Sequence, residues 1–132
     1  MSRRLKLLPL IALAAATFAA SAAFADAGPP QSNCFRARDW ISWKSPAPNV
    51  VLVKVGANRV FRLDLRQGSD QLKYSDVHLT NRNMHSAWLC SPLDFDLMLS
   101  DTHGVIHQSL AVSSLRPLTP DEIAAIPPSD RP

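Results

Sequence analysis

The chain has 132 residues, of which 46% are apolar and 19% charged, and its formal net charge is +3 at pH 7. The basic excess of three comes entirely from Arg3, Arg4 and Lys6 near the start. The rest of the chain has eleven basic and eleven acidic side chains. The charge therefore gives no reason to expect a nucleic-acid or anionic-lipid partner, and no basic stripe with stacking aromatics is present.

Residues 1–25 have the pattern of an export signal. A basic start precedes an apolar run over residues 7–20, and Ala23 and Ala25 supply the small side chains that a signal peptidase reads. We expect cleavage between Ala25 and Asp26 and a periplasmic or secreted protein. An uncleaved anchor is the weaker alternative, because the run is shorter than the roughly 20 residues that span a bilayer.

Proline and glycine divide the remaining chain into three parts. Residues 26–33 form a flexible lead, residues 34–126 a single β-rich domain, and residues 127–132 a proline-rich tail. The length after cleavage is typical of one domain with one core.

Cys34 and Cys90 are the only two cysteines. In an exported chain, an even cysteine count favours a disulfide. The bridge would close a long loop and stabilise the fold by roughly 4 kcal/mol. Two buried thiols are the alternative.

Alternating apolar residues predict short strands. Residues 49–55 and 61–65 flank a turn at Gly56 and read as a β-hairpin. A break is expected at Pro46-Ala47-Pro48, and a strand and turn before it, in residues 34–44. Further strands are predicted at residues 77–80, 87–90, 95–99 and 106–115. The fold class is mainly β, a small antiparallel barrel or sandwich of about six short strands.

A short helix should close the domain. Thr119 stands at the N-cap, Pro120 at the first helical position, and Glu122 where a capping box needs it. The helix should run to about Ile126 and end at Pro127.

Several short pieces occur in a characteristic order: Cys34-Phe35, Arg38-Asp39, the valine-rich strand with Gly56, residues 60–65, Trp88-Leu89-Cys90, and residues 116–122. Together they resemble the exported proteobacterial proteins grouped as domain of unknown function 6491. The resemblance spans almost the whole chain after the leader and implies an envelope or secreted protein without an assigned activity. Members often carry two further cysteines, where this chain has residues 69–72 and 107–110. Their joint absence implies that the missing pair would bond to each other, which leaves Cys34 to pair with Cys90.

Histidines and aspartates offer a weak metal-site hypothesis. His103 and His107 lie near Asp101, while Asp76 and His78 could share a strand face. The residues around His103 are typical of a turn, so the main interpretation is that these histidines lie in loops exposed to solvent. A pH response based on histidine is a further alternative. We expect no cofactor and no metal site.

Catalytic signatures are weak as well. The sequence contains no Gly-x-Ser-x-Gly elbow and no His-Glu-x-x-His helix. Asp94 and Asp96 lie on the same face if Phe95 is in a strand. The simplest interpretation is that this face is exposed to solvent. Paired acid–base catalysis by the two carboxylates is the alternative.

Trp40 and Trp43 are either core residues or part of a binding surface with Arg36 and Arg38. The core interpretation is the main one, because aromatic side chains supply much of the buried area in a small β domain. If the pair is exposed, Arg36, Arg38, Trp40 and Trp43 form the candidate binding surface, for an envelope protein or a glycan.

The sequence thus predicts an exported, non-enzymatic binding or structural module of the cell envelope. The alternative is a small secreted enzyme or metal-binding protein that uses His and Asp residues.

Overall fold

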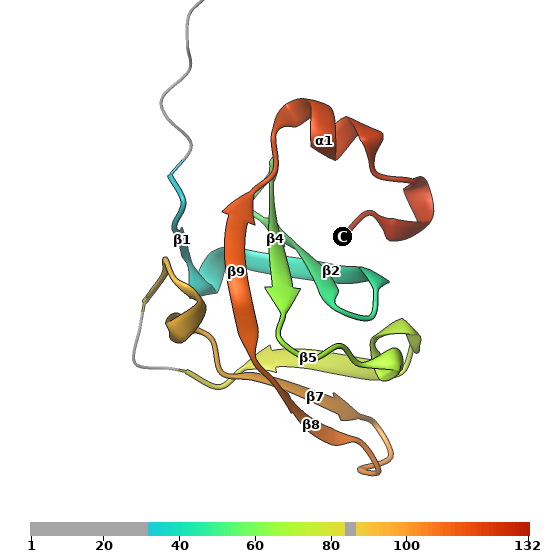
Figure 1. Cartoon of the computed structure of the whole chain (residues 1–132). Helices are drawn as coiled ribbons and strands as arrows, with labels where there is room; N and C mark the ends of the chain where they lie inside the picture. Colours follow the sequence, from blue (N-terminus) through green and yellow to red (C-terminus); the bar gives the residue numbers. More distant parts are fainter. Residues whose placement is uncertain (1–31, 84–86) are drawn as a thin grey trace, which may run out of the picture.

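The computed structural model describes residues 32–83 and 87–132. The predicted leader and its cleavage site lie outside this range. Within it the chain forms three antiparallel sheets and one short α-helix (Figure 1). The strands are β1 (Phe35–Arg36), β2 (Trp40–Ala47), β3 (Val50–Val55), β4 (Arg59–Leu65), β5 (Val77–Asn81), β6 (Trp88–Leu89), β7 (Leu97–Asp101), β8 (His107–Leu110) and β9 (Val112–Pro117). The mainly β fold is confirmed, as an open sandwich-like arrangement with more strands than the expected six.

The largest sheet has the strand order β2-β3-β4-β9, and its central strand β3 is buried on both faces. One face of β3 carries Val51 and Val53, which belong to the main core. The other face carries Val50 and Leu52, which pack with Ile126 after the C-terminal helix in a second, smaller cluster. The predicted hairpin is confirmed as β3 and β4, since Val50 pairs with Asp64 and Val55 with Arg59.

The second sheet, β5-β7-β8, closes the main core from below (Figure 1). Its buried side chains include Leu79 and Leu97. Phe35 from β1 is 1% exposed and lies at the centre of an aromatic cluster, 4.6 Å from the Phe61 ring and 6.2 Å from the Phe95 ring between centroids. This ring therefore joins the small β1–β6 pair to β4 of the largest sheet and to the segment just before β7.

The prediction of a single strand over residues 106–115 is wrong. The structure divides it at Ala111 into β8, which pairs with β7, and β9, which pairs with β4. The Ala111 carbonyl accepts a hydrogen bond from the backbone N–H of Arg66, the residue after β4. The chain thus crosses from one sheet to the other at this residue.

The predicted break at Pro46 is also misplaced, because β2 continues to Ala47 and the turn follows at residues 48–49. A proline is tolerated here since β2 is an edge strand and position 46 lies at an irregularity of the ladder, between the Lys44–Leu52 and Ala47–Val50 pairs. Ser45 Oγ lies 2.7 Å from the Ala47 carbonyl oxygen and 2.8 Å from that of Val50, which ties the strand end to β3.

Two other boundaries differ from the prediction. The stretch 34–44 holds β1, a 3-10 turn at Ala37–Asp39 and the start of β2. In the stretch 95–99 the strand begins only at Leu97, because Phe95 follows the 3-10 turn Pro92–Asp94.

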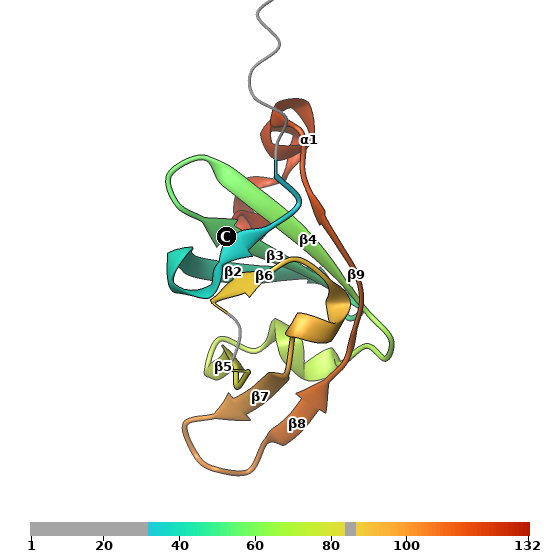
Figure 2. The ribbon, with the colours of Figure 1, turned by 90° about the vertical axis from the view of Figure 1, so that its left-hand side faces the viewer.

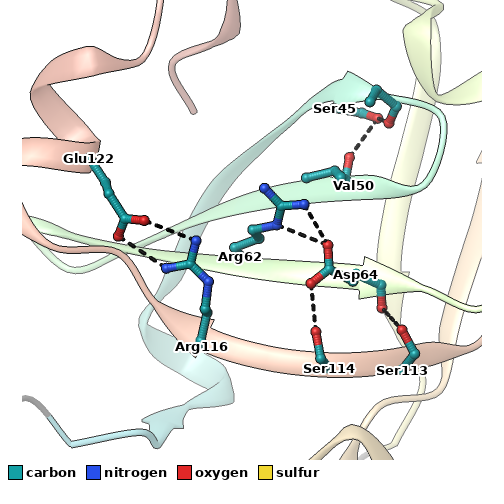
Figure 3. A network of polar contacts seen from close by, with 9 residues as sticks. Ser45, Val50, Arg62, Asp64, Ser113, Ser114, Arg116 and Glu122 are labelled. Atoms are coloured by element: carbon teal, nitrogen blue, oxygen red, sulfur yellow. Dashed lines mark hydrogen bonds and ion pairs between the residues drawn. The ribbon is translucent and has the colours of Figure 1, made fainter.

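The predicted C-terminal helix is confirmed as α1 (Pro120–Ala125). Thr119 Oγ1 accepts from the Glu122 backbone N–H at 3.2 Å, and Glu122 Oε2 accepts from the Thr119 N–H at 2.9 Å, which completes a capping box. Arg116 on β9 donates two hydrogen bonds to the Glu122 carboxylate, both at 3.0 Å (Figure 3). A further 3-10 turn, Pro128–Asp130, lies in the segment predicted as a tail.

Asp64 holds β4 to β9 farther from this helix (Figure 3). Its carboxylate accepts from Ser114 Oγ at 2.6 Å and from Arg62 Nε at 2.9 Å. The bond from Ser114 and then that from Arg62 lower the pKa of Asp64. Every carboxylate and guanidinium in this network has a partner, so its role is structural.

Candidate functional site

A groove of about 880 Å³ opens where β1, β2, β5 and β6 meet. Figure 2 shows this side of the molecule, with β6 between β2 above it and β5 below it. We call it the tryptophan groove and define it by six of its lining residues: Arg36, Arg38, Trp40, Ile41, Trp43 and Trp88. The four residues of the candidate binding surface all lie on it.

Trp40 and Trp43 combine the two roles that the sequence offered as alternatives. Both are half-buried and pack against the main core, and the Trp40 ring meets Phe35 edge-on at 6.5 Å. Both also line the groove. Their inner parts therefore stabilise the fold while their outer parts are available to a ligand.

A β-bulge explains how two tryptophans three residues apart face the same way. Trp40 pairs with Val55 and Trp43 pairs with Val53, and the register shifts between Trp40 and Ser42. Because Val53 and Val55 share one face of β3, their partners share it too. The bulged residue, Ile41, is 63% exposed.

Arg36 and Trp88, from β1 and β6, form a further wall of the groove. They are directly paired across β1 and β6, and the Arg36 guanidinium carbon lies 4.9 Å from the centroid of the Trp88 ring. This distance is typical of a cation–π contact. Trp88 is 47% exposed, whereas its neighbour Leu89 is fully buried. Sequence reasoning did not place Trp88 in the candidate surface, although strand alternation around Leu89 was a usable signal.

The Cys34–Cys90 disulfide is confirmed, with the two Cα atoms 4.2 Å apart. It joins the residue before β1 to the residue after β6. The bond therefore fixes the backbone from which Arg36 and Trp88 project. Such a bond is compatible with an oxidising compartment.

The charge of the groove is positive. Among the described residues that line it are Arg36 and Arg38, and none of them is an aspartate or glutamate. Arg38 Nε lies 3.8 Å from Asp39 Oδ1, but the Arg38 side chain stays 73% exposed. A long, exposed pair of this kind neutralises little of the arginine's field.

Asn81, at the end of β5, adds a polar group to the lining. Its Oδ1 accepts from the Asp96 backbone N–H at 2.8 Å, which sets the orientation of the amide. Its Nδ2 is buried and has no hydrogen-bond partner within the described residues. Buried donors of this kind are uncommon in folded proteins.

The histidines of the metal hypothesis are exposed. His103 lies in the turn after β7, and His107 begins β8. Asp101 Oδ1 accepts from the backbone N–H groups of Ile106 at 2.9 Å and Val105 at 2.8 Å, and these bonds lower the pKa of Asp101. No group of three or more potential metal ligands occurs among residues 32–83 and 87–132.

Asp76 and His78 are exposed as well, in the turn before β5 and on β5 itself. They do not line the tryptophan groove.

Asp94 and Asp96 do not share a strand face, because both precede β7. Asp94 Oδ2 accepts from the backbone N–H groups of Cys90 and Ser91, each at 2.8 Å, and these bonds lower its pKa. Asp96 pairs with Arg82 at 2.8 Å. Each carboxylate therefore has its own structural partner.

None of the helices in the described ranges is long and apolar enough to cross a membrane. Comparison with family models, with curated proteins and with solved structures gave no significant match.

Proposed function

We propose that the protein is a non-enzymatic binding module of the cell envelope and that the tryptophan groove is its binding site. The observation that carries this proposal is the gathering of three tryptophans and two arginines from β1, the 3-10 turn after it, β2 and β6 around one groove. Tryptophan and arginine contribute a large share of binding energy at protein interfaces. The resemblance to domain of unknown function 6491 agrees with this proposal and stays a prediction.

The chemistry of the lining favours binding over catalysis. The described lining residues include no histidine, carboxylate or cysteine that would act as a base or as an activated nucleophile. Asp94 and Asp101 accept hydrogen bonds from loop backbone groups instead, and Asp96 forms an ion pair with Arg82.

The proposed location is the periplasm or the outside of the cell. The export pattern in residues 1–25 and the disulfide both support it.

Site-specific photo-cross-linking in cells that export the protein tests the proposal. The photoreactive amino acid p-benzoylphenylalanine replaces Ile41 in the groove or, as a control, Val105, which is 82% exposed and lies outside it. We expect an adduct of defined mass from position 41 and none from position 105. The adduct should disappear when Arg36 and Arg38 are both changed to Glu. Equal labelling at both positions, or no adduct at position 41, would contradict the proposal.

A further inference from the structure

The tryptophan groove runs between the open edges of two sheets. Within the described residues β2 is the end strand of its sheet and pairs only with β3. In the same way β5 is the end strand of the second sheet and pairs only with β7. Trp40–Trp43 on one side and Leu79–Asn81 on the other line the groove. An open sheet edge presents backbone N–H and C=O groups that can pair with another chain.

We propose that this groove binds an extended, acidic segment of a partner protein, which adds to the open edge of β2 as an extra strand. The inference rests on the proposed function and specifies its ligand. In this mode of recognition, backbone hydrogen bonds supply affinity, and side-chain pockets on alternate residues supply specificity.

Charge complementarity selects an acidic segment. Arg36 and Arg38 are the charged side chains among the described lining residues, so an acidic ligand would meet no like charge there. A guanidinium binds a carboxylate through paired, charge-assisted hydrogen bonds. A basic peptide would instead face two positive charges.

The apolar lining selects a large side chain between the acidic ones. Ile41 and Trp88 are 63% and 47% exposed, and the outer parts of Trp40 and Trp43 lie beside them. Because side chains of a strand alternate in direction, a segment with alternating acidic and apolar residues would match both features.

The shape of β2 limits how much strand can be added. The bulge at Ile41 and the proline at position 46 interrupt the regular edge. Bulges and prolines are devices that protect edge strands from open-ended pairing. We therefore expect a short strand to be added between these two interruptions, at residues 42–45, without growth into larger assemblies.

A display library of random ten-residue peptides, selected against the oxidised protein, provides the test. We expect selected sequences to be rich in Asp and Glu between β-branched or aromatic residues. The best peptide, made synthetically with a fluorescent label, should bind about tenfold or more weakly to the Arg36→Glu, Arg38→Glu double variant. Ile41→Glu should weaken binding as well, while Val105→Glu, the matched control, should leave it unchanged. Thermal unfolding of each variant establishes that it is folded.

Methylation of the peptide's backbone nitrogens tests strand addition directly. Alternate N–H groups of an added strand face β2, so methyl groups at every second position should abolish binding and those between should not. Uniform tolerance of methylation, no acidic preference, or no selected binder would overturn the inference. So would a dimer of this chain that Ile41→Glu dissociates, or a glycan cross-linked at position 41. In these cases a specific adduct at position 41 would still support the proposed binding function.

Discussion

Removal of the disulfide should cost a large part of the stability of this domain. The bond joins residues 56 apart in sequence, and closing a loop of that length corresponds to about 4 kcal/mol in the chain-entropy model. Cys90 is exposed and Cys34 half-buried, so changing both to Ala should leave little or no cavity. The loss should therefore come mainly from the greater freedom of the unfolded chain. Typical domains are stable by only about 5–15 kcal/mol.

Urea unfolding of the oxidised protein and of the Cys34→Ala, Cys90→Ala variant measures this loss. The m-value should rise in the variant, because an unfolded chain without the cross-link exposes more surface. A loss below about 1 kcal/mol would refute the reasoning, since it would mean that the denatured chain already keeps the two residues together.

The same variant should loosen the groove more than the sheets. Phe35 and Leu89 are fully buried and should keep β1 and β6 attached to the core. Each of these strands has only two residues, however, and the disulfide lies next to both. Hydrogen exchange at the Ala37 amide, which donates to the Ala87 carbonyl at 3.1 Å, should therefore rise more than exchange in β3 and β4. Equal protection in the two proteins would show that the bond does not hold this wall.

Three further predictions concern the fold. Phe35→Ala should lower the free energy of unfolding by about 3–5 kcal/mol, measured by urea unfolding, because it empties the centre of the aromatic cluster. Gly68→Ala should destabilise by about 1–3 kcal/mol, since its Cβ would lie 2.9 Å from the Pro48 carbonyl oxygen, and an unchanged urea midpoint would contradict this. Hydrogen bonds from Arg116 lower the pKa of Glu122 from 4.5 to about 2, so its stabilising contribution is complete above pH 4.5 and is lost as the pH falls through about 2. The melting temperature of Glu122→Gln should lack this part of the acid dependence, and parallel profiles would contradict the assignment.

Local signals in the sequence predicted the elements that depend on local chemistry. The hairpin of β3 and β4 and the capping box of α1 follow from alternation, turn residues and cap residues close together in the chain. The division at Ala111 could not be predicted in this way, because alternation continues across it while the pairing partner changes. The passage of β2 through Pro46 depends on the strand lying at an edge, which is a property of the whole sheet.

The candidate surface was only partly predictable, because some of its residues are close together in the sequence and others are brought together by strand pairing. The segment before Pro46 contains Arg36, Arg38, Trp40 and Trp43, and its composition alone drew attention to it. Trp88 joins this surface only through the β1–β6 pairing, which links residues about fifty positions apart. A bulge also had to align Trp40 with Trp43, and the sequence carries no clear signal for that bulge.

The position of the exposed apolar residues gives the groove its strongest claim to function. Scattered apolar residues on a protein surface are ordinary, whereas a group of them in one place usually marks an interaction site. Leu93 and Val105 are the most exposed large apolar residues described, yet neither lines the groove. Ile41 and Trp88 come from separate strands and both line the groove, one wall of which the disulfide holds. The main core is complete without Ile41 and Trp88, so packing of the fold does not account for their position. The proposed binding of a ligand would account for it.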